Sequence, residues 1–153
     1  MDTLELLLRK YANNFLLLND ITNNTKIEYL NFNNIIIVTD TNLIKIPSVE
    51  KVLNYFKNNF NAKILTLSSG EPNYKIIEST AKKIFNEKYD LVISLGGGSI
   101  LDIVKSASMY ENSVENVDNF SGSRKQYTQR LIPTLAIPTT AGTGSEYTHT
   151  SVY

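Results

Sequence analysis

The chain has 153 residues with 15 acidic and 15 basic side chains, so it lacks the net positive charge that attracts nucleic acids and acidic membranes. It contains no cysteine, which excludes disulfides, thiolate metal ligands and cysteine nucleophiles. A hydrophobic fraction of 42% is ordinary for a globular protein, no apolar run is long enough to span a membrane, and no basic leader opens the chain. We therefore expect a cytoplasmic protein without nucleic-acid or membrane partners.

The first 33 residues show one amphipathic pattern. Apolar residues recur at helical spacing from Leu4 to Leu18, and residues 19–25 are polar and typical of a loop. A short run at residues 26–30 has the composition of an edge strand. We treat residues 1–33 as an N-terminal helix and loop of unassigned role, separate from a domain at residues 34–153.

From residue 34 onward, short apolar runs alternate with helical patterns. Four runs read as strands, at residues 34–40, 62–67, 91–95 and 131–138. Helical patterns begin at Pro47-Ser48, cover residues 76–85, and run from Ser99 to about residue 110. This alternation predicts an α/β fold, with a Rossmann-like parallel sheet, helices on both faces and right-handed crossovers. Residues 111–130 are polar and aperiodic, as in a loop.

A polar segment follows each of the four predicted strands. In sheets of this kind, ligands bind beyond the carboxyl ends of the strands. We therefore expect a binding site where four segments meet, namely Asp40, residues 68–73, residues 96–99 and residues 139–146.

The third of these segments has the pattern of a phosphate cradle. Gly96, Gly97 and Gly98 follow a buried strand directly and lead into a helix. Glycines let the backbone approach an anion, and the first N–H groups of a helix have no partner inside it. A structural alternative remains, because Ser99 and Asp102 have the spacing of a capping box.

Asp40 and a set of hydroxyl side chains could contact a nucleotide. A carboxylate at the end of a strand can accept hydrogen bonds from an adenosine ribose and repel a 2′-phosphate, although aspartate is also a common turn residue. Thr139, Thr140, Thr143 and Ser145 place four hydroxyls within seven residues, interleaved with glycines. A loop of this composition suits a sugar or phosphate better than it suits a purely structural turn.

The sequence alone leaves the roles of three charged or titratable residues open. Asp102 is either a helix cap or a group near the ligand, and Lys105 is either solvated or paired with phosphate. His149 is the only histidine, and one histidine without partners does not make a metal site. We therefore expect no metal ligand at this position.

Two motifs together resemble the signatures of a known family. The stretch 96–105, Gly-Gly-Gly-Ser-Ile-Leu-Asp-Ile-Val-Lys, resembles the GGGSxxDxAK signature of the iron-containing (group III) alcohol dehydrogenases. The stretch 137–146, Ile-Pro-Thr-Thr-Ala-Gly-Thr-Gly-Ser-Glu, is similar to that family's second signature. The end of the 34–40 strand and the Glu-Pro-Asn turn at 71–73 also match in order and spacing. Val104 stands where the family usually has alanine.

The resemblance implies roles for individual residues. Asp40 would bind the adenosine ribose and select NAD over NADP. Backbone and side-chain groups of Gly97, Gly98 and Ser99 would hold the pyrophosphate, while the hydroxyls of Thr139, Thr140 and Thr143 would contact the cofactor. Asn73 and Asp102 would lie near the nicotinamide or the substrate.

The resemblance also implies what this chain lacks. In the family an aspartate and three histidines hold Fe2+ or Zn2+ in a helical C-terminal domain, and this chain ends before the corresponding region. We therefore expect the cofactor-binding half of a dehydrogenase that acts on a small alcohol or aldehyde, with no metal ligand in this chain and little activity alone. A homodimer is the candidate assembly.

The sequence also leaves alternatives for the substrate and for the role of the chain. The tail at residues 146–153 slightly resembles members that reduce phosphonoacetaldehyde. The dehydroquinate synthase and glycerol-1-phosphate dehydrogenase branches share the glycine signature but fit the second motif less well. A non-catalytic nucleotide-binding module, or a truncated remnant that does not fold alone, is the alternative reading.

Overall fold

The computed structural model describes residues 32–68, 70–109, 132–146, 148 and 151. The chain divides after residue 31 into two units, and the described residues all belong to the second, residues 32–153. The helix predicted over residues 4–18, the short strand at 26–30 and the loop at 111–130 lie outside the described residues.

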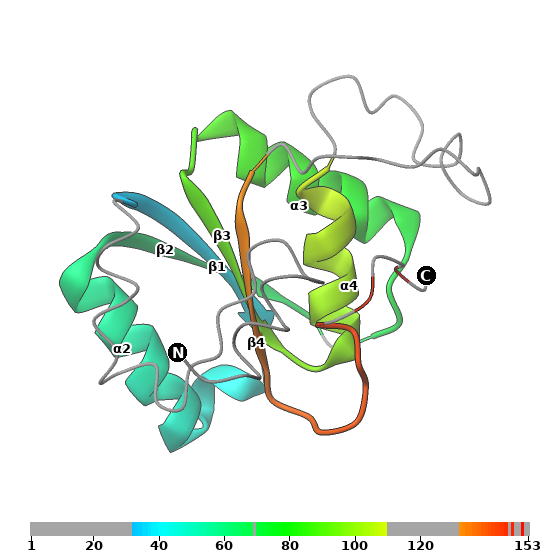
Figure 1. The fold of residues 1–153 in the computed structure, drawn as a ribbon, viewed down its shortest axis with the longest axis horizontal. Coiled ribbons are helices and arrows are strands. Elements are labelled where there is room, and N and C mark those ends of the chain that lie inside the picture. Colours follow the sequence, from blue (N-terminus) through cyan, green and yellow to red (C-terminus); the bar gives the residue numbers. More distant parts are fainter. Residues whose placement is uncertain (1–31, 69, 110–131, 147, 149–150, 152–153) are drawn as a thin grey trace, which may run out of the picture. The chain divides into compact units, whose positions relative to one another are not determined.

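Four parallel strands form one sheet, which confirms the predicted fold class (Figure 1). They are β1 (Asn34–Asp40), β2 (Asn61–Leu67), β3 (Leu91–Gly96) and β4 (Thr134–Pro138), in the order β2-β1-β3-β4. Strands β1 and β3 lie in the middle, and their apolar runs are buried on both faces of the sheet. Central strands of a parallel sheet need such continuous runs because helices cover both sides.

In the described residues, three α-helices and a short 3-10 helix follow the strands. They are η2 (Leu43–Lys45), α2 (Pro47–Asn59), α3 (Tyr74–Asn86) and α4 (Gly98–Ala107). Helix α2 lies on one side of the sheet, while α3 and α4 lie on the other (Figure 1). The chain moves outward from β1 to β2 and then back past β1 to β3 and β4, so right-handed crossovers place α2 opposite α3 and α4.

The side chains of the central strands pack into a hydrophobic core on each face of the sheet. Alternate residues of β1 point to opposite faces, so Ile36 and Val38 join a buried cluster with residues of α3 and α4. Ile35 and Ile37, which are fully buried, face the side of α2, where Phe56 is also fully buried. The helix that was predicted to run from Ser99 to about residue 110 begins at Gly98 and ends at Ala107.

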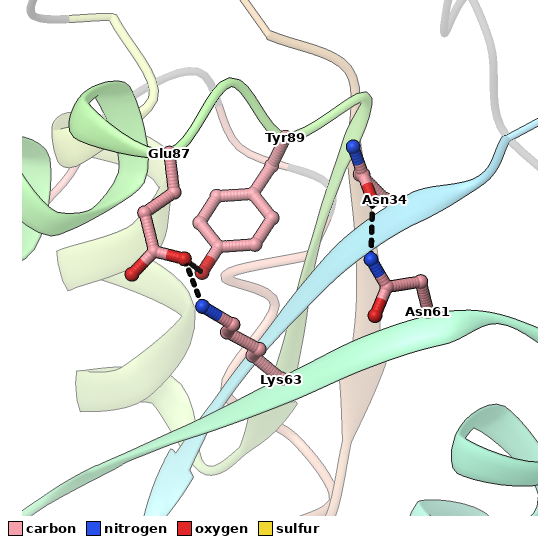
Figure 2. Close-up of polar contacts among 5 residues, drawn as sticks. All are labelled: Asn34, Asn61, Lys63, Glu87 and Tyr89. Carbon is pink, nitrogen blue, oxygen red and sulfur yellow. Dashed lines mark hydrogen bonds and ion pairs between the residues drawn. The ribbon is translucent and has the colours of Figure 1, made fainter.

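Polar contacts join the elements near the amino ends of the strands. Figure 2 shows Lys63 of β2 paired with Glu87, which also accepts a hydrogen bond of 3.0 Å from the hydroxyl of Tyr89. These two donors, Lys63 first, lower the pKa of the Glu87 carboxyl. Partial burial and the bond to Glu87 raise the pKa of Tyr89 to about 12. The Asn61 amide donates to the side-chain oxygen of Asn34 at 2.6 Å, which links β2 to β1 (Figure 2).

Asp90 fixes the start of β1 against the start of β3. Its Oδ2 accepts hydrogen bonds from the backbone N–H groups of Asn33 and Asn34, each at 3.0 Å. These two bonds, first that from Asn34, lower the pKa of the Asp90 carboxyl because they stabilise its charged form. No helix in the described part of the chain is long and apolar enough to cross a membrane.

Candidate functional site

A pocket of about 460 Å³ lies at the carboxyl ends of the strands. Its walls come from the carboxyl ends of all four strands and the segments that follow them: Asp40, Asn42 and Leu43 at and after the end of β1, Ser68 and Gly70 after β2, Gly97, Gly98 and Ser99 after β3, and Thr139 and Thr140 after β4. The predicted meeting of four segments at one edge is therefore confirmed. Connections from β1 and β3 leave in opposite directions, so the pocket occupies the switch point where ligands bind in such sheets.

Strand β3 runs into α4 through the glycine turn. Gly97 is the N-cap residue, in an extended conformation, and its carbonyl accepts the N–H of Leu101 at 3.1 Å. The N-cap residue makes no side-chain hydrogen bond to this helix. The capping-box alternative for Ser99 is therefore wrong, because the helix begins one residue earlier and Ser99 lies exposed in its first turn. Unbonded N–H groups at a helix start favour an anion.

Gly96 permits the close approach of strand and helix. A Cβ at this position would lie 2.8 Å from both Cβ and Cγ1 of Ile100, closer than real carbon contacts allow. Ile100 itself is buried against the pocket from the first turn of α4. Any side chain at residue 96 would therefore push the helix start away from the sheet.

The second motif packs against the glycine turn. The Thr139 N–H donates to the carbonyl of Gly96 at 2.9 Å, which continues the pairing of β3 and β4 into the loop. A Cβ on Gly97 would lie 3.4 Å from Thr140 Oγ1, and one on Gly98 would lie 3.4 Å from atoms of Thr143 and Ser145. The two signatures thus meet across a gap that glycine leaves open. Thr143 does not line the pocket but lies next to its wall.

Two glycines in the 139–146 loop adopt left-handed backbone conformations. Gly142 has a φ of 84° and Gly144 has a φ of 66°, which other residues adopt only at a cost. They let the chain turn within a few residues, so that Ser145 comes to lie close to Gly98. The alternation of glycine and hydroxyl residues in the sequence is explained by this turn.

Asp40 makes the turn contact that its sequence position suggested, and it also lies at the pocket wall. It ends β1 and lines the pocket, half-buried. Its Oδ1 accepts the N–H of Asn42 at 2.7 Å, a short-range contact typical of an aspartate turn. The turn fixes the direction of a carboxylate at the pocket wall.

Asn73 and Asp102 do not line this pocket. Asn73 is the N-cap of α3, where its Oδ1 accepts the N–H of Ile76 at 3.1 Å. Asp102 pairs with Lys105 at 2.9 Å, and the two side chains are only 10% and 6% exposed. Lys105 is therefore not solvated, and the pair neutralises both charges inside the fold. Because α4 has Gly97 as its N-cap, Asp102 lies beyond the first turn and is not the cap residue.

His149 lies outside the described residues. For some residues of the pocket wall, nothing in the sequence indicated that they would line a pocket. Asn42 and Leu43 belong to the connection around η2, which is too short for a periodic pattern. Ile100 and Ile103 belong to α4, and their position at the pocket depends on where that helix starts. The described residues contain no group of three or more His, Cys, Asp and Glu side chains that could hold a metal ion.

The structure is a Rossmann-like α/β domain with a pocket at the switch point of the sheet. The chain belongs to the iron-containing alcohol dehydrogenase family, whose sequence profile matches residues 19–153. The predicted family is thereby confirmed.

Among curated relatives, a long-chain-alcohol dehydrogenase of Geobacillus thermodenitrificans is 34% identical over 131 residues, which is 83% of this chain and 33% of that protein. A mitochondrial hydroxyacid-oxoacid transhydrogenase of Xenopus tropicalis is 32% identical over 133 residues, 83% of this chain and 29% of that protein. The chain thus spans about a third of the length of these relatives.

Solved structures show the same fold. A 1,3-propanediol oxidoreductase superposes with a TM-score of 0.69 at 27% identity, covering 86% of this chain and 35% of that one. A sulfoacetaldehyde reductase of Bifidobacterium kashiwanohense, solved in complex with NAD+, superposes with a TM-score of 0.68 at 26% identity, covering 84% of this chain and 33% of that one. Members of this family are oxidoreductases, and at least one binds NAD.

Proposed function

We propose that residues 34–153 form the NAD-binding domain of a metal-dependent alcohol dehydrogenase or aldehyde reductase. One observation carries the proposal: both family signatures form the wall of one pocket, at the uncapped start of α4. The chain's own contribution is to bind and orient the dinucleotide, so that hydride transfer takes place at a defined position. The relatives are about three times as long as this chain, so activity and substrate choice are properties of such a whole protein.

The glycine turn is suited to the pyrophosphate. The N–H groups at the start of α4 need acceptors, and the helix dipole favours a negative charge at this end. Gly97 and Gly98 carry no side chain into the gap beside Thr140 and Thr143, so an anion can approach the backbone. Ser99 adds an exposed hydroxyl in the first turn, and Thr139 adds another from the opposite wall.

Asp40 is suited to the adenosine ribose. Its carboxylate lies at the wall formed after β1, and the Asn42 N–H holds one of its oxygens in place. A carboxylate in this position accepts hydrogen bonds from ribose hydroxyls and repels a 2′-phosphate. NAD is therefore the proposed cofactor, in preference to NADP.

A bound nicotinamide supplies hydride chemistry, and in this family a metal ion polarises the substrate oxygen. The described residues do not fit an Fe2+ or Zn2+ site, because they contain no cluster of suitable ligands. For the substrate we propose a small alcohol or aldehyde. The tail at 146–153 suggests phosphonoacetaldehyde, an anionic aldehyde like the sulfoacetaldehyde named for the reductase above.

The proposal is tested by titrating NADH with this chain and following the nicotinamide fluorescence. We expect saturable binding by the wild type and loss of binding in Asp40→Ala and Gly98→Val. Asp90→Ala is the matched control, because it removes a carboxylate near the amino ends of the strands and away from the pocket wall. Unchanged NADH fluorescence at millimolar wild-type protein would refute the cofactor assignment. Binding without aldehyde-dependent NADH oxidation would favour a non-catalytic nucleotide-binding module.

A further inference from the structure

Helix α4 carries a buried ion pair that the proposed cofactor site does not use. Every residue from Ile100 to Ala107 is buried, including the charged Asp102 and Lys105. The Lys105 ammonium donates to Asp102 Oδ1 at 2.9 Å and to Thr148 Oγ1 at 3.1 Å. The second contact joins α4 to a residue that lies 43 positions further along the chain.

A buried ion pair is a weak device for stability alone. Its desolvation cost offsets much of its Coulomb energy, and apolar side chains of similar size often replace such a pair without loss. The contact with Thr148 suggests a different use. An ammonium with three protons can hold a carboxylate on its own helix and still direct a donor to a second element.

The loop at residues 139–146 is fastened at both ends by this arrangement. At its start, the Thr139 N–H bonds to the carbonyl of Gly96. Just beyond its end, Thr148 accepts the hydrogen bond from Lys105. Between these two points the loop contains the left-handed Gly142 and Gly144, which restrict the backbone very little on their own.

We propose that Lys105 is a positioning residue, which holds the 139–146 loop against the glycine turn through Thr148. Asp102 keeps the ammonium in place, and the ammonium keeps the end of the loop beside α4. Thr140 and Ser145 then stay next to Gly97 and Gly98, so that the hydroxyls and the helix N–H groups face one anion together. This inference rests on the proposed function, because it concerns the same pocket.

The first test replaces the hydroxyl that Lys105 binds. Thr148→Val removes it at nearly constant shape, and Thr148→Ser keeps it. Since a hydrogen bond to a charged group is involved, we expect the NADH dissociation constant to rise about tenfold in the valine variant. The serine variant should restore binding to within about twofold of wild type, on the same scale. Thr66→Val, an exposed threonine of β2, is the matched control and should change nothing.

A double-mutant comparison addresses Lys105 itself. Lys105→Met combined with Asp102→Asn removes both charges at similar volume, so neither is left buried alone. It should weaken NADH binding by a similar factor, and adding Thr148→Val to it should have no further effect. Independent, multiplying effects of the two changes would overturn the proposed link between Lys105 and Thr148.

Amide hydrogen exchange separates this inference from the cofactor assignment. In the protein without cofactor, Thr148→Val should speed exchange within residues 139–146, leave β1 and β3 unchanged, and be rescued by Thr148→Ser. If the wild type fails to bind NADH, the cofactor proposal fails, and this measurement still decides the positioning role. Equal exchange rates in the valine variant and the wild type, or equal NADH affinity where the wild type binds, would overturn it.

Discussion

Gly96 and Gly98 lie two residues apart in the same signature, yet the structure assigns them different physical roles. At Gly96 an added Cβ would lie 2.8 Å from Cβ of Ile100. That atom is attached to the backbone of α4 and cannot swing away, so Gly96→Ala must move the helix or the strand. At Gly98 an added Cβ would lie 3.4 Å from Thr143 and Ser145, within ordinary van der Waals contact.

The expected effects on stability therefore differ between the two positions. Overpacking a close contact costs about 1–3 kcal/mol, so we expect Gly96→Ala to lower the free energy of unfolding by about 2 kcal/mol. With a urea slope of about 1–3 kcal/mol per molar, the unfolding midpoint should fall by about 1 M. Gly98→Ala should leave the midpoint unchanged or slightly raised, because alanine favours a helix over glycine by up to about 1 kcal/mol.

Gly98→Ala, which should hardly change stability, should clearly weaken NADH binding. The Gly98 methyl would enter the gap between the helix start and the 139–146 loop, so we expect NADH affinity to fall at least about tenfold, the equivalent of about 1.4 kcal/mol. The assays are urea unfolding followed by circular dichroism and NADH fluorescence titration. Gly70→Ala is the stability control, since nothing lies within 4 Å of its added Cβ. A wild-type midpoint in Gly96→Ala would refute the close packing of strand and helix.

Two further predictions concern the loop and the opposite end of the sheet. Gly144→Ala forces a side chain into a φ of 66°, at a cost of about 1–2 kcal/mol, so we expect weaker NADH binding than in the wild type, measured by the same titration. Asp90→Ala should lower the urea midpoint at neutral pH, because it removes a charged carboxylate that accepts hydrogen bonds from two backbone N–H groups. Since the folded pKa of Asp90 lies below its ordinary 3.8, this stabilisation is present above that pH and is lost as the pH falls through the lowered value. The midpoints of wild type and variant should therefore converge in acid, and a constant difference would contradict the assignment.

Much of the fold could be predicted because local signals and tertiary structure agree. The β-branched run at residues 34–40 became β1 with the same bounds, and Pro47 starts α2 at the position where its missing N–H costs nothing. The convergence of four segments followed from the topology of parallel sheets alone. Pairing partners such as Asn61 and Asn34 could not be inferred, because they depend on the register of two strands.

The failures concern contacts between residues far apart in the chain. Lys105 has the sequence pattern of a solvated helix residue one turn after an acid, and only the fold shows that it is buried and reaches Thr148. The pocket wall at Leu43 likewise depends on how a short connection folds back over the end of β1. Periodicity describes one element at a time, so it carries no information about either contact.

The conflicts between local rules and structure concentrate on α4. Its N-cap residue, Gly97, makes no side-chain cap hydrogen bond, and its interior buries a lysine and an aspartate. It also follows Gly96, where any side chain would collide with Ile100. Each feature costs stability when considered alone. Together they place unbonded N–H groups at the mouth of a pocket and fasten the facing loop. Natural proteins tolerate such violations where a function recovers the cost, and a bound anion would satisfy the N–H groups at this helix start.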